Sequence, residues 1–234
     1  QVTGDPFTVV EPGVRNTETN QGNLIADALL WQGRQLAAEF GSPLPVVGIQ
    51  NGGGIRNDSV IDCAGEGLSE LSTFEMLPFS NFVSIVTVPR PQFREILENA
   101  VSAVEAGSGR FAQVAGVRFS YDRTGTPREG DDDGTEITAG TRIIDAALDD
   151  GTQIISGGAV LPGGDITIAT IDFLARGGDQ YPFRGLPFTS VGVSYQLALF
   201  NYLTGDPRSG ALGGAITAAA YPDGGEARIS DLTP

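Results

Sequence analysis

Aromatic and acidic side chains flank a double glycine within residues 170–183, whose sequence is TIDFLARGGDQYPF. Phe173 and Asp179 are six positions apart, and Gly177 and Gly178 between them can adopt the left-handed conformation that ends a helix. A bend there would direct an aromatic face and a carboxylate toward one small volume, which suits a ligand with a flat ring and hydroxyl groups. The same residues also fit a capped helix with a core phenylalanine and a surface aspartate, and this stretch alone favours that second interpretation.

A second candidate site is the glycine-rich turn NGGGIRN at residues 51–57, which follows an apolar stretch typical of a buried strand. Consecutive glycines let a backbone approach another group closely, and Arg56 can present a planar guanidinium to a phosphate or carboxylate. The spacing is not a dinucleotide-binding fingerprint, because Asn57 replaces the third glycine and no helix follows. An anion site and a glycine turn with an exposed arginine both fit this stretch.

Two weaker candidates lie elsewhere in the chain. Arg15 precedes a predicted helix, where backbone N–H groups and the helix dipole favour an anion, although a solvated loop arginine is the favoured interpretation of Arg15 alone. Asp131, Asp133 and Glu136 supply the oxygen ligands that calcium accepts. An EF-hand loop would need a longer pattern with a later glutamate, so residues 124–141 are interpreted as an acidic hairpin insert in preference to a calcium site.

The chain contains no histidine and one cysteine. Without histidine it cannot carry a Ser-His-Asp or Cys-His mechanism, and it lacks the usual general base near neutral pH. Nearly every catalytic zinc, iron or manganese site is also excluded, because oxygen ligands alone remain. Cys63 cannot form an internal disulfide and is expected to be a small buried hydrophobic residue. A hydrolase that works from this chain alone is therefore not expected.

The composition narrows the class of partner. The 234 residues include 29 acidic and 14 basic side chains, all of the latter arginine, and the net charge is −15. This charge argues against binding to nucleic acid or to an anionic membrane surface, both of which need a basic surface. No apolar run approaches eighteen residues, so no membrane span is predicted. The chain begins with Gln1 and has no leader sequence, which suggests a processed protein or an excised domain.

Helices and strands are intermixed along the chain without a linker or a repeat, which predicts one α+β domain with a mixed sheet and packed helices. Apolar periodicity predicts helices over residues 21–40, 68–76, 91–106, 171–176 and 191–203. Asn20 is the predicted N-cap of the first helix. Strands are expected over residues 7–10, 46–50, 82–88, 111–121, 142–148, 153–161 and 165–170. Residues 204–234 are expected to form a partly irregular tail.

Five separated stretches, taken in order, resemble the C-terminal domain of the 5′-nucleotidase family. That family includes bacterial periplasmic nucleotidases and UDP-sugar hydrolases, 2′,3′-cyclic phosphodiesterases and animal ecto-nucleotidases. The stretches are RNTETNQGNLIADA (15–28), NGGGIR (51–56), LPFSN (77–81), FAQVAGVRFSYD (111–122) and DFLARGGDQYPF (172–183). Each is weak singly, but the ordered set spans most of the chain from residue 15 to about 190 and is specific.

The resemblance implies that residues 1–234 form a domain that recognises a nucleotide or nucleoside. In the family this domain stacks the base between two phenylalanine rings, and the matching residues here are Phe79 and Phe173. Asp179 matches the carboxylate that holds the ribose hydroxyl groups. Asn81 and Gly116 match residues at the edge of the base.

At the other end of the implied site, Arg15 and Arg56 match arginines directed at the phosphate, and Asn51 lies beside them. Family enzymes also carry an N-terminal metallophosphoesterase domain, in which two divalent metal ions activate the attacking hydroxide. Several ligands of those ions are histidines, so this chain is expected to be the recognition domain alone, inactive by itself and without a cofactor of its own.

The resemblance also implies an extracellular, periplasmic or cell-surface protein. Two alternatives stay open. The chain is a stand-alone nucleoside-binding or nucleotide-binding module without catalysis, or it recognises a different phosphoester or a sulfur-linked substrate.

Overall fold

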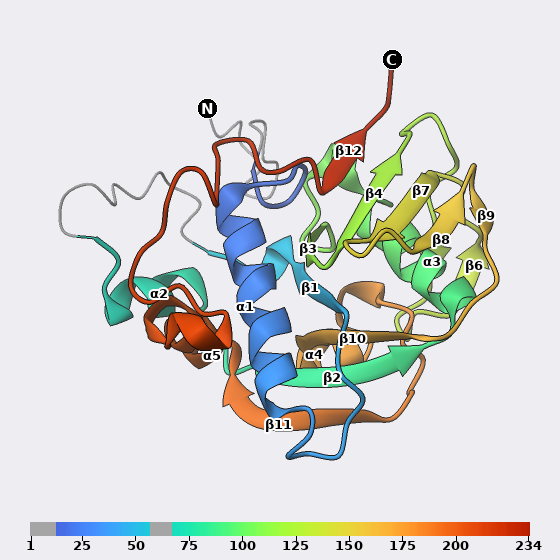
Figure 1. Cartoon of the computed structure of the whole chain (residues 1–234). Coiled ribbons are helices and arrows are strands. Elements are labelled where there is room, and N and C mark those ends of the chain that lie inside the picture. The colour runs from blue at the N-terminus through green and yellow to red at the C-terminus, as the bar shows by residue number, and fades with distance from the viewer. Residues whose placement is uncertain (1–12, 57–66) are drawn as a thin grey trace.

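The computed structural model of the chain describes residues 13–56 and 67–234. Within these ranges, two five-stranded sheets and a two-stranded hairpin combine with five α-helices (Figure 1). The expected strand at residues 7–10 and the expected burial of Cys63 concern residues outside the described ranges.

The first sheet is mixed, and its two central strands are parallel. Its strands are β11 (Phe188–Ser194), β2 (Phe82–Val88), β10 (Ile166–Ile171), β1 (Val47–Asn51) and β3 (Ala112–Ala115), in that spatial order. Strands β1 and β10 run parallel, and all of their residues are buried, as their continuous apolar sequences predict. Because β1 and β10 are parallel, the turns that follow both strands lie at the same edge of the sheet.

Helix α1 (Asn20–Leu36) packs across β1, β3 and β10 and is flanked by α5 (Tyr195–Thr204) (Figure 1). Its N-cap is Thr19, whose Oγ1 accepts a 3.0 Å hydrogen bond from the Gly22 N–H, so the prediction of Asn20 was wrong by one residue. The helix ends at Leu36, four residues before the predicted boundary of residue 40.

The second sheet is built from β12 (Ile229–Asp231), β4 (Val117–Tyr121), β7 (Ile143–Leu148), β8 (Gln153–Ser156) and β9 (Ala159–Val160), in that order. Helix α3 (Arg90–Ala100) packs against β7 and β9. The hairpin of β5 (Glu129–Gly130) and β6 (Glu136–Thr138) is the predicted acidic insert. One hydrophobic cluster includes residues of both sheets, which confirms the predicted single α+β domain.

The predicted helix over residues 191–203 was wrong in its first part. Residues up to Ser194 belong to strand β11, which pairs with β2, and the helix α5 begins at Tyr195. The valines on either side of Gly192 favour the extended pairing, and the Ser194 hydroxyl then caps the helix by accepting from the Leu197 N–H at 3.1 Å. The helix predicted over residues 91–106 likewise ends early, at Ala100, and a short 3₁₀ turn (Val104–Ala106) follows it.

Two short helices complete the fold: α2 (Glu70–Met76), capped by Ser69, and α4 (Asp172–Ala175), which follows β10 directly. The C-terminal tail beyond α5 has little regular structure, as predicted, apart from the turn Pro207–Ser209 and strand β12. No helix among the described residues has the length and apolar character needed to cross a membrane.

Candidate functional site

A pocket of about 430 Å³ lies at the edge of the first sheet where β1 and β10 end. Ligands of sheets with parallel strands characteristically bind at the carboxyl ends of those strands. Seven of the residues predicted from the sequence line this one pocket, although they come from distant segments: Arg15, Asn51, Arg56, Phe79, Asn81, Phe173 and Asp179. The remaining wall consists of Gly53, Gly54, Gly109 and Ile171.

The two phenylalanines of the pocket are partly exposed. Phe79 is 43% exposed and Phe173 is 42% exposed, so each presents ring surface to the pocket. Phe173 lies on the short helix α4, and its ring packs over Gly178, where an added Cβ would come within 2.5 Å of the ring. Glycine at position 178 therefore allows the aromatic ring to lie this close to the backbone.

Phe79 is fixed from two sides. The Arg56 guanidinium lies over its ring, 4.9 Å from the centroid, which is a cation–π geometry. The backbone N–H of Phe79 donates a 3.0 Å hydrogen bond to the Tyr195 hydroxyl, which in turn donates to the Gly54 carbonyl at 3.3 Å. The buried phenol thus joins the aromatic wall of the pocket to the glycine turn.

Tyr195 was not found from the sequence. It begins α5, more than a hundred positions from Phe79, and an apolar helix pattern does not distinguish a supporting tyrosine from an ordinary core residue. Burial raises the pKa of Tyr195 to about 12, so its hydroxyl stays protonated and keeps its donor function at any physiological pH.

Asp179 also lines the pocket, and its backbone conformation is strained. Its φ of 54° and the φ of 60° at Gln180 place two consecutive non-glycine residues in the left-handed region. One carboxylate oxygen of Asp179 accepts a 2.6 Å hydrogen bond from the Asn51 side-chain amide. Among the described residues its other carboxylate oxygen accepts no hydrogen bond, so it can accept one from a ligand.

The glycine turn between these walls is tightly packed. An added Cβ at Gly52 would lie 2.1 Å from the Val14 carbonyl oxygen, and one at Gly54 would lie 2.3 Å from the Gln50 amide nitrogen. The turn directs Arg56 back toward Gly53, whose carbonyl accepts a hydrogen bond from its guanidinium. Within residues 13–56 and 67–234, no carboxylate forms an ion pair with Arg56, so its charge is not neutralised by a described acid.

The structure does not bring Gly116 to this pocket. Gly116 joins β3 to β4 with a φ of 74°, and an added Cβ would lie 2.0 Å from the Val46 carbonyl oxygen. In the pairing of β3 with β1, Ala112 lies opposite Asn51, so the pocket is at the start of β3 and Gly116 follows its far end. Gly116 therefore permits a close chain crossing, and Gly109 is the glycine of this segment that lines the pocket.

The candidate calcium ligands do not converge either. Asp131 and Asp133 both accept from the Thr135 backbone N–H, at 2.8 and 2.9 Å, and so stabilise the turn of the hairpin. Glu136 instead lies 3.9 Å from the Arg128 guanidinium. Among the described residues no group of three or more His, Cys, Asp or Glu side chains is arranged to hold a metal ion.

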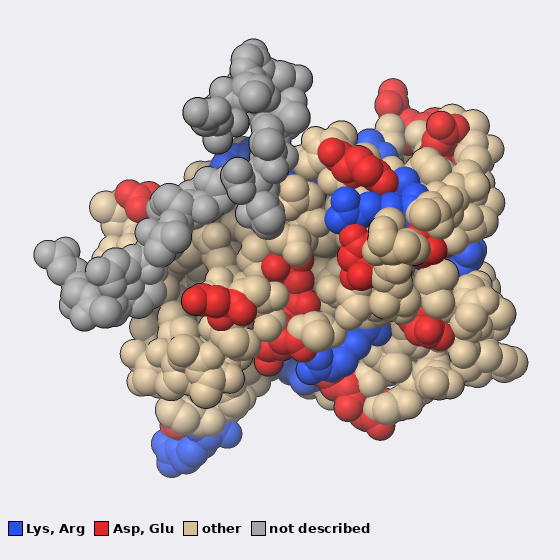
Figure 2. All heavy atoms as spheres, turned by 90° about the horizontal axis from the view of Figure 1, so that it is seen from above, with Lys and Arg blue, Asp and Glu red and all other residues tan. Residues whose placement is uncertain are grey.

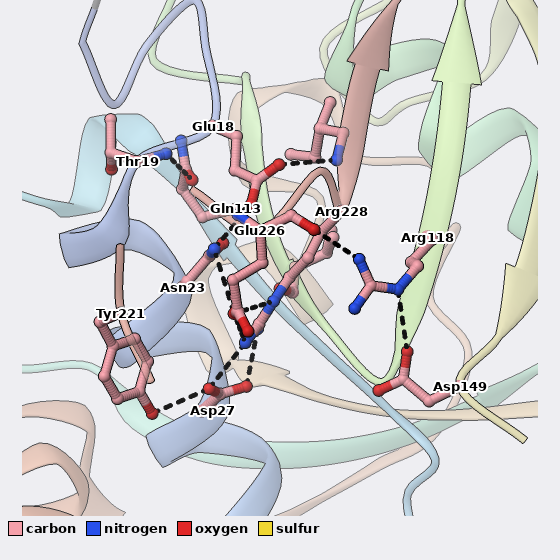
Figure 3. Close-up of polar contacts among 12 residues, drawn as sticks. Glu18, Thr19, Asn23, Asp27, Gln113, Arg118, Asp149, Tyr221, Glu226 and Arg228 are labelled. Atoms are coloured by element: carbon pink, nitrogen blue, oxygen red, sulfur yellow. Dashed lines mark hydrogen bonds and ion pairs between the residues drawn. The ribbon is translucent and has the colours of Figure 1, made fainter. Parts of the chain in front are cut away.

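A second cavity, of about 480 Å³, lies between α1 and the C-terminal tail, with Trp31 and Tyr202 in its wall. Its wall contains three carboxylates, Asp27, Asp149 and Asp150. Asp27 is already bonded: it accepts from Arg228 at 2.7 and 2.9 Å and from the Tyr221 hydroxyl at 2.9 Å (Figure 3). The smaller pocket at the ends of β1 and β10 combines two exposed phenylalanine rings with a carboxylate and an arginine, and it is the better candidate for a ligand site.

Comparisons with known proteins identify a family and relatives of this chain. The sequence profile of the family described as "5′-nucleotidase, C-terminal domain" matches residues 2–185. The trifunctional nucleotide phosphoesterase protein YfkN of Bacillus subtilis is 32% identical over 170 residues, which cover 72% of this chain and 10% of that protein. The 5′-nucleotidase of Bos taurus is 31% identical over 114 residues, covering 48% of this chain and 20% of that one.

The fold matches the crystal structure of a 5′-nucleotidase precursor from Thermus thermophilus with a TM-score of 0.69 and 24% identity. That match covers 94% of this chain and 36% of the Thermus chain. The chain thus spans only a part, between a tenth and about a third, of the relatives it matches.

Proposed function

Since the chain belongs to the 5′-nucleotidase family, as its C-terminal domain, we propose that it recognises a nucleoside or nucleotide in the pocket at the ends of β1 and β10. The observation that carries this proposal is the convergence of two exposed phenylalanine rings, one carboxylate and an arginine without a described acidic partner in one pocket. Few other ligand classes combine a flat ring, vicinal hydroxyl groups and an anionic group in one small molecule.

The base would stack between Phe79 and Phe173. Stacking of a base on an aromatic side chain contributes about 1–3 kcal/mol and tolerates different bases, because every base has an aromatic face. Asn81, in the same lining, would reach the edge of the base with its amide. This amide is the polar group through which the pocket could prefer one base over another.

The sugar and the phosphate would occupy the glycine-turn end. A carboxylate can accept hydrogen bonds from two vicinal hydroxyl groups, which suits Asp179 to the ribose. Guanidinium groups donate in a fork that fits phosphate oxygens, which suits Arg56 and Arg15. The amide of Asn51 lines the same pocket and already donates to Asp179.

Hydrolysis would belong to an N-terminal metallophosphoesterase domain carrying two divalent metal ions, which supply the attacking hydroxide. The residues of this chain do not fit such a centre, since it lacks histidine and no suitable cluster occurs among the described residues. The contribution of this chain would be to bind the nucleotide and carry it to the metals by a rotation between domains. An extracellular, periplasmic or cell-surface setting fits the acidic composition.

Isothermal titration calorimetry of the chain with adenosine, AMP and UDP-glucose tests the proposal. Phe173→Ala is expected to weaken adenosine binding about tenfold or more, as the loss of one stacking face predicts. Phe82→Ala is the matched control, because Phe82 is also 42% exposed and is not part of the pocket wall. Equal affinity in the wild type and Phe173→Ala would refute the stacking site.

A further inference from the structure

The acidic hairpin packs directly on the loop that carries Asp179. At Gly134, in the turn of the hairpin, an added Cβ would lie 2.8 Å from the Tyr181 carbonyl oxygen and 2.9 Å from the Pro182 Cα. At Gly177, in the loop, the corresponding position is 3.6 Å from the Asp133 carbonyl oxygen. The turn of the hairpin is therefore in direct contact with the loop of residues 177–182.

Arg128 connects the hairpin to the body of the domain. Its side chain is fully buried, and it donates to the Asn99 side-chain oxygen at 3.2 Å and to the Gly134 carbonyl at 2.5 Å. Its nearest acidic partner is Glu136 at 3.9 Å. Burial is the main cause that lowers the pKa of Arg128, and Glu136 opposes it only in part. Burial of a charged guanidinium is costly in free energy, so we expect Arg128 to have a role other than that of a surface ion pair.

Asn99 completes the connection to the pocket. This fully buried amide near the end of α3 accepts from Arg128 and donates its own N–H to the Asp179 carbonyl at 3.1 Å. The residue it holds, together with Gln180, has the left-handed backbone conformation described above. A sparsely populated conformation persists only where its surroundings maintain it.

We propose that Asn99 and Arg128 are positioning residues that hold Asp179 at the sugar end of the pocket, so that the acidic hairpin sets selectivity for ribose hydroxyl groups. The inference rests on the proposed function, because it assigns the sugar contact to Asp179. It gives the insert a specific role, since the turn of the hairpin supplies the Gly134 carbonyl, which fixes one arm of the guanidinium while the other arm fixes Asn99.

Two substitutions break this connection at different points. Arg128→Met removes both donors but retains an apolar chain of similar length. It leaves the Asn99 and Gly134 oxygens without this donor and should lower stability, so a urea titration first identifies conditions under which the variant is folded. Asn99→Leu keeps a side chain branched at the same carbon and removes the bridge to Asp179. Thr138→Val is the matched control, because Thr138 lies on the same hairpin and bonds only Glu129 among the described side chains, on the exposed side.

The experiment compares the affinities of adenosine and 2′,3′-dideoxyadenosine by calorimetry, and the amide hydrogen exchange of residues 177–183, in the whole 234-residue chain. We expect both variants to bind adenosine more weakly by about tenfold or more, the loss expected for one hydrogen bond to a charged group. Dideoxyadenosine affinity should be unchanged, and exchange of residues 177–183 should accelerate. Thr138→Val should behave as the wild type.

Two results would overturn the inference. In the first, Arg128→Met changes neither the ratio of the two affinities nor the hydrogen exchange of residues 177–183. In the second, the variants lose affinity for adenosine and for dideoxyadenosine by the same factor. A wild type that binds both ligands equally would refute the ribose role of Asp179 and hence the selectivity. The exchange data would then still decide whether Asn99 and Arg128 hold the loop, so the two failures are distinguishable.

Discussion

The candidate pocket and the charged cluster of Asp27, Glu226 and Arg228 beside α1 use arginine in opposite ways. In the cluster, Arg228 donates to both oxygens of Asp27 and also to Glu226 (Figure 3). In the pocket, Arg56 lies over the Phe79 ring and bonds backbone carbonyls. The nearby Asp179 is paired with an amide rather than with a guanidinium.

The comparison distinguishes side chains that stabilise the fold, such as Arg228, from side chains that we propose bind a ligand, such as Arg56. The cluster attaches the C-terminal tail to α1: Tyr221 bonds Asp27, and the Glu18 carboxylate accepts from the Ile229 N–H at 2.9 Å. Figure 2 shows the molecule from above, and most arginines on this face lie beside acidic residues. Among the described residues Arg34, Arg90 and Arg110 also form no ion pair, so Arg56 is distinguished by its place in the pocket wall together with the lack of a described acidic partner.

The largest expected effect is on the cluster. Burial disfavours the charged form of Arg228, but the hydrogen bond and charge of Asp27, followed by Glu226, outweigh it and raise its pKa above the usual value. Arg228→Ala leaves those carboxylates close together without a cation, and it should lower the free energy of unfolding by about 3 kcal/mol in urea titrations.

Arg208→Ala is the control for this prediction. Arg208 pairs with Asp206 on the surface, with 91% of its side chain exposed, so its removal should leave the urea midpoint unchanged. If the two variants unfold at the same urea concentration, the cluster does not stabilise the fold.

The next largest effect concerns Arg56. Arg56→Ala should weaken AMP binding by about 1.5–3 kcal/mol, tenfold or more, because a charge-assisted hydrogen bond to phosphate is lost. Adenosine, which lacks the phosphate, should lose much less. Calorimetric titrations measure both, and equal losses would show that Arg56 does not contact the phosphate.

Arg176→Ala is the matched control for Arg56→Ala. Arg176 also lies over a phenylalanine ring, 5.1 Å from the centroid of Phe188, but it is not part of the pocket wall. Its replacement should leave the affinities for AMP and adenosine unchanged.

A smaller effect is expected at the support behind Phe79. Tyr195→Phe removes the hydroxyl that accepts from the Phe79 N–H and donates to Gly54, and it should weaken adenosine binding by about 1 kcal/mol. A calorimetric titration that shows wild-type adenosine affinity in a folded Tyr195→Phe would mean that the phenol does not position the ring.

The smallest effect is a pH dependence at Glu98, a buried carboxylate distinct from both regions. Burial is the main cause that raises the pKa of Glu98, despite hydrogen bonds from the Arg142 and Ile143 N–H groups. The folded state therefore keeps this proton at a higher pH than the unfolded state does. The associated stability is present below the unfolded pKa, about 4.3, and is lost as pH rises through the folded value.

Glu98→Gln removes this titration. The free energy of unfolding of the wild type, relative to that of Glu98→Gln, should fall as the pH rises above the unfolded pKa in urea titrations. A constant difference across that range would show that the pKa of Glu98 is not raised in the folded state.

The walls of the pocket could be predicted from the sequence because their residues occur in short, recognisable stretches. Residues 172–183 carry an aromatic, a glycine bend and an acid within one segment, and the structure brings them to the same pocket wall. Gly116 was assigned to the site by the same resemblance, but it lies elsewhere. A glycine within a predicted strand is equally well explained by a close crossing of two chain segments, so its type does not identify a site residue.

The supports behind the pocket could not be predicted. Asn99 and Arg128 are 29 positions apart, and Tyr195 is 116 positions from Phe79, so no local pattern links them. The bond between Asp27 and Arg228 could not be predicted for the same reason, because it joins α1 to a distant tail with little regular structure. At the start of α5, pairing of β11 with β2 prevails over local helical periodicity.

The central claim is that Phe79 and Phe173 hold a base between their rings, and the proton spectrum of the ligand reports on it directly. During titration of adenosine with the chain, the H2 and H8 protons of adenine should move upfield, because aromatic faces shield protons placed above them. The shift at saturation should be smaller in Phe173→Ala, which keeps only the Phe79 face, and unchanged in Phe82→Ala. Saturable binding without an upfield shift of either proton would contradict the claim.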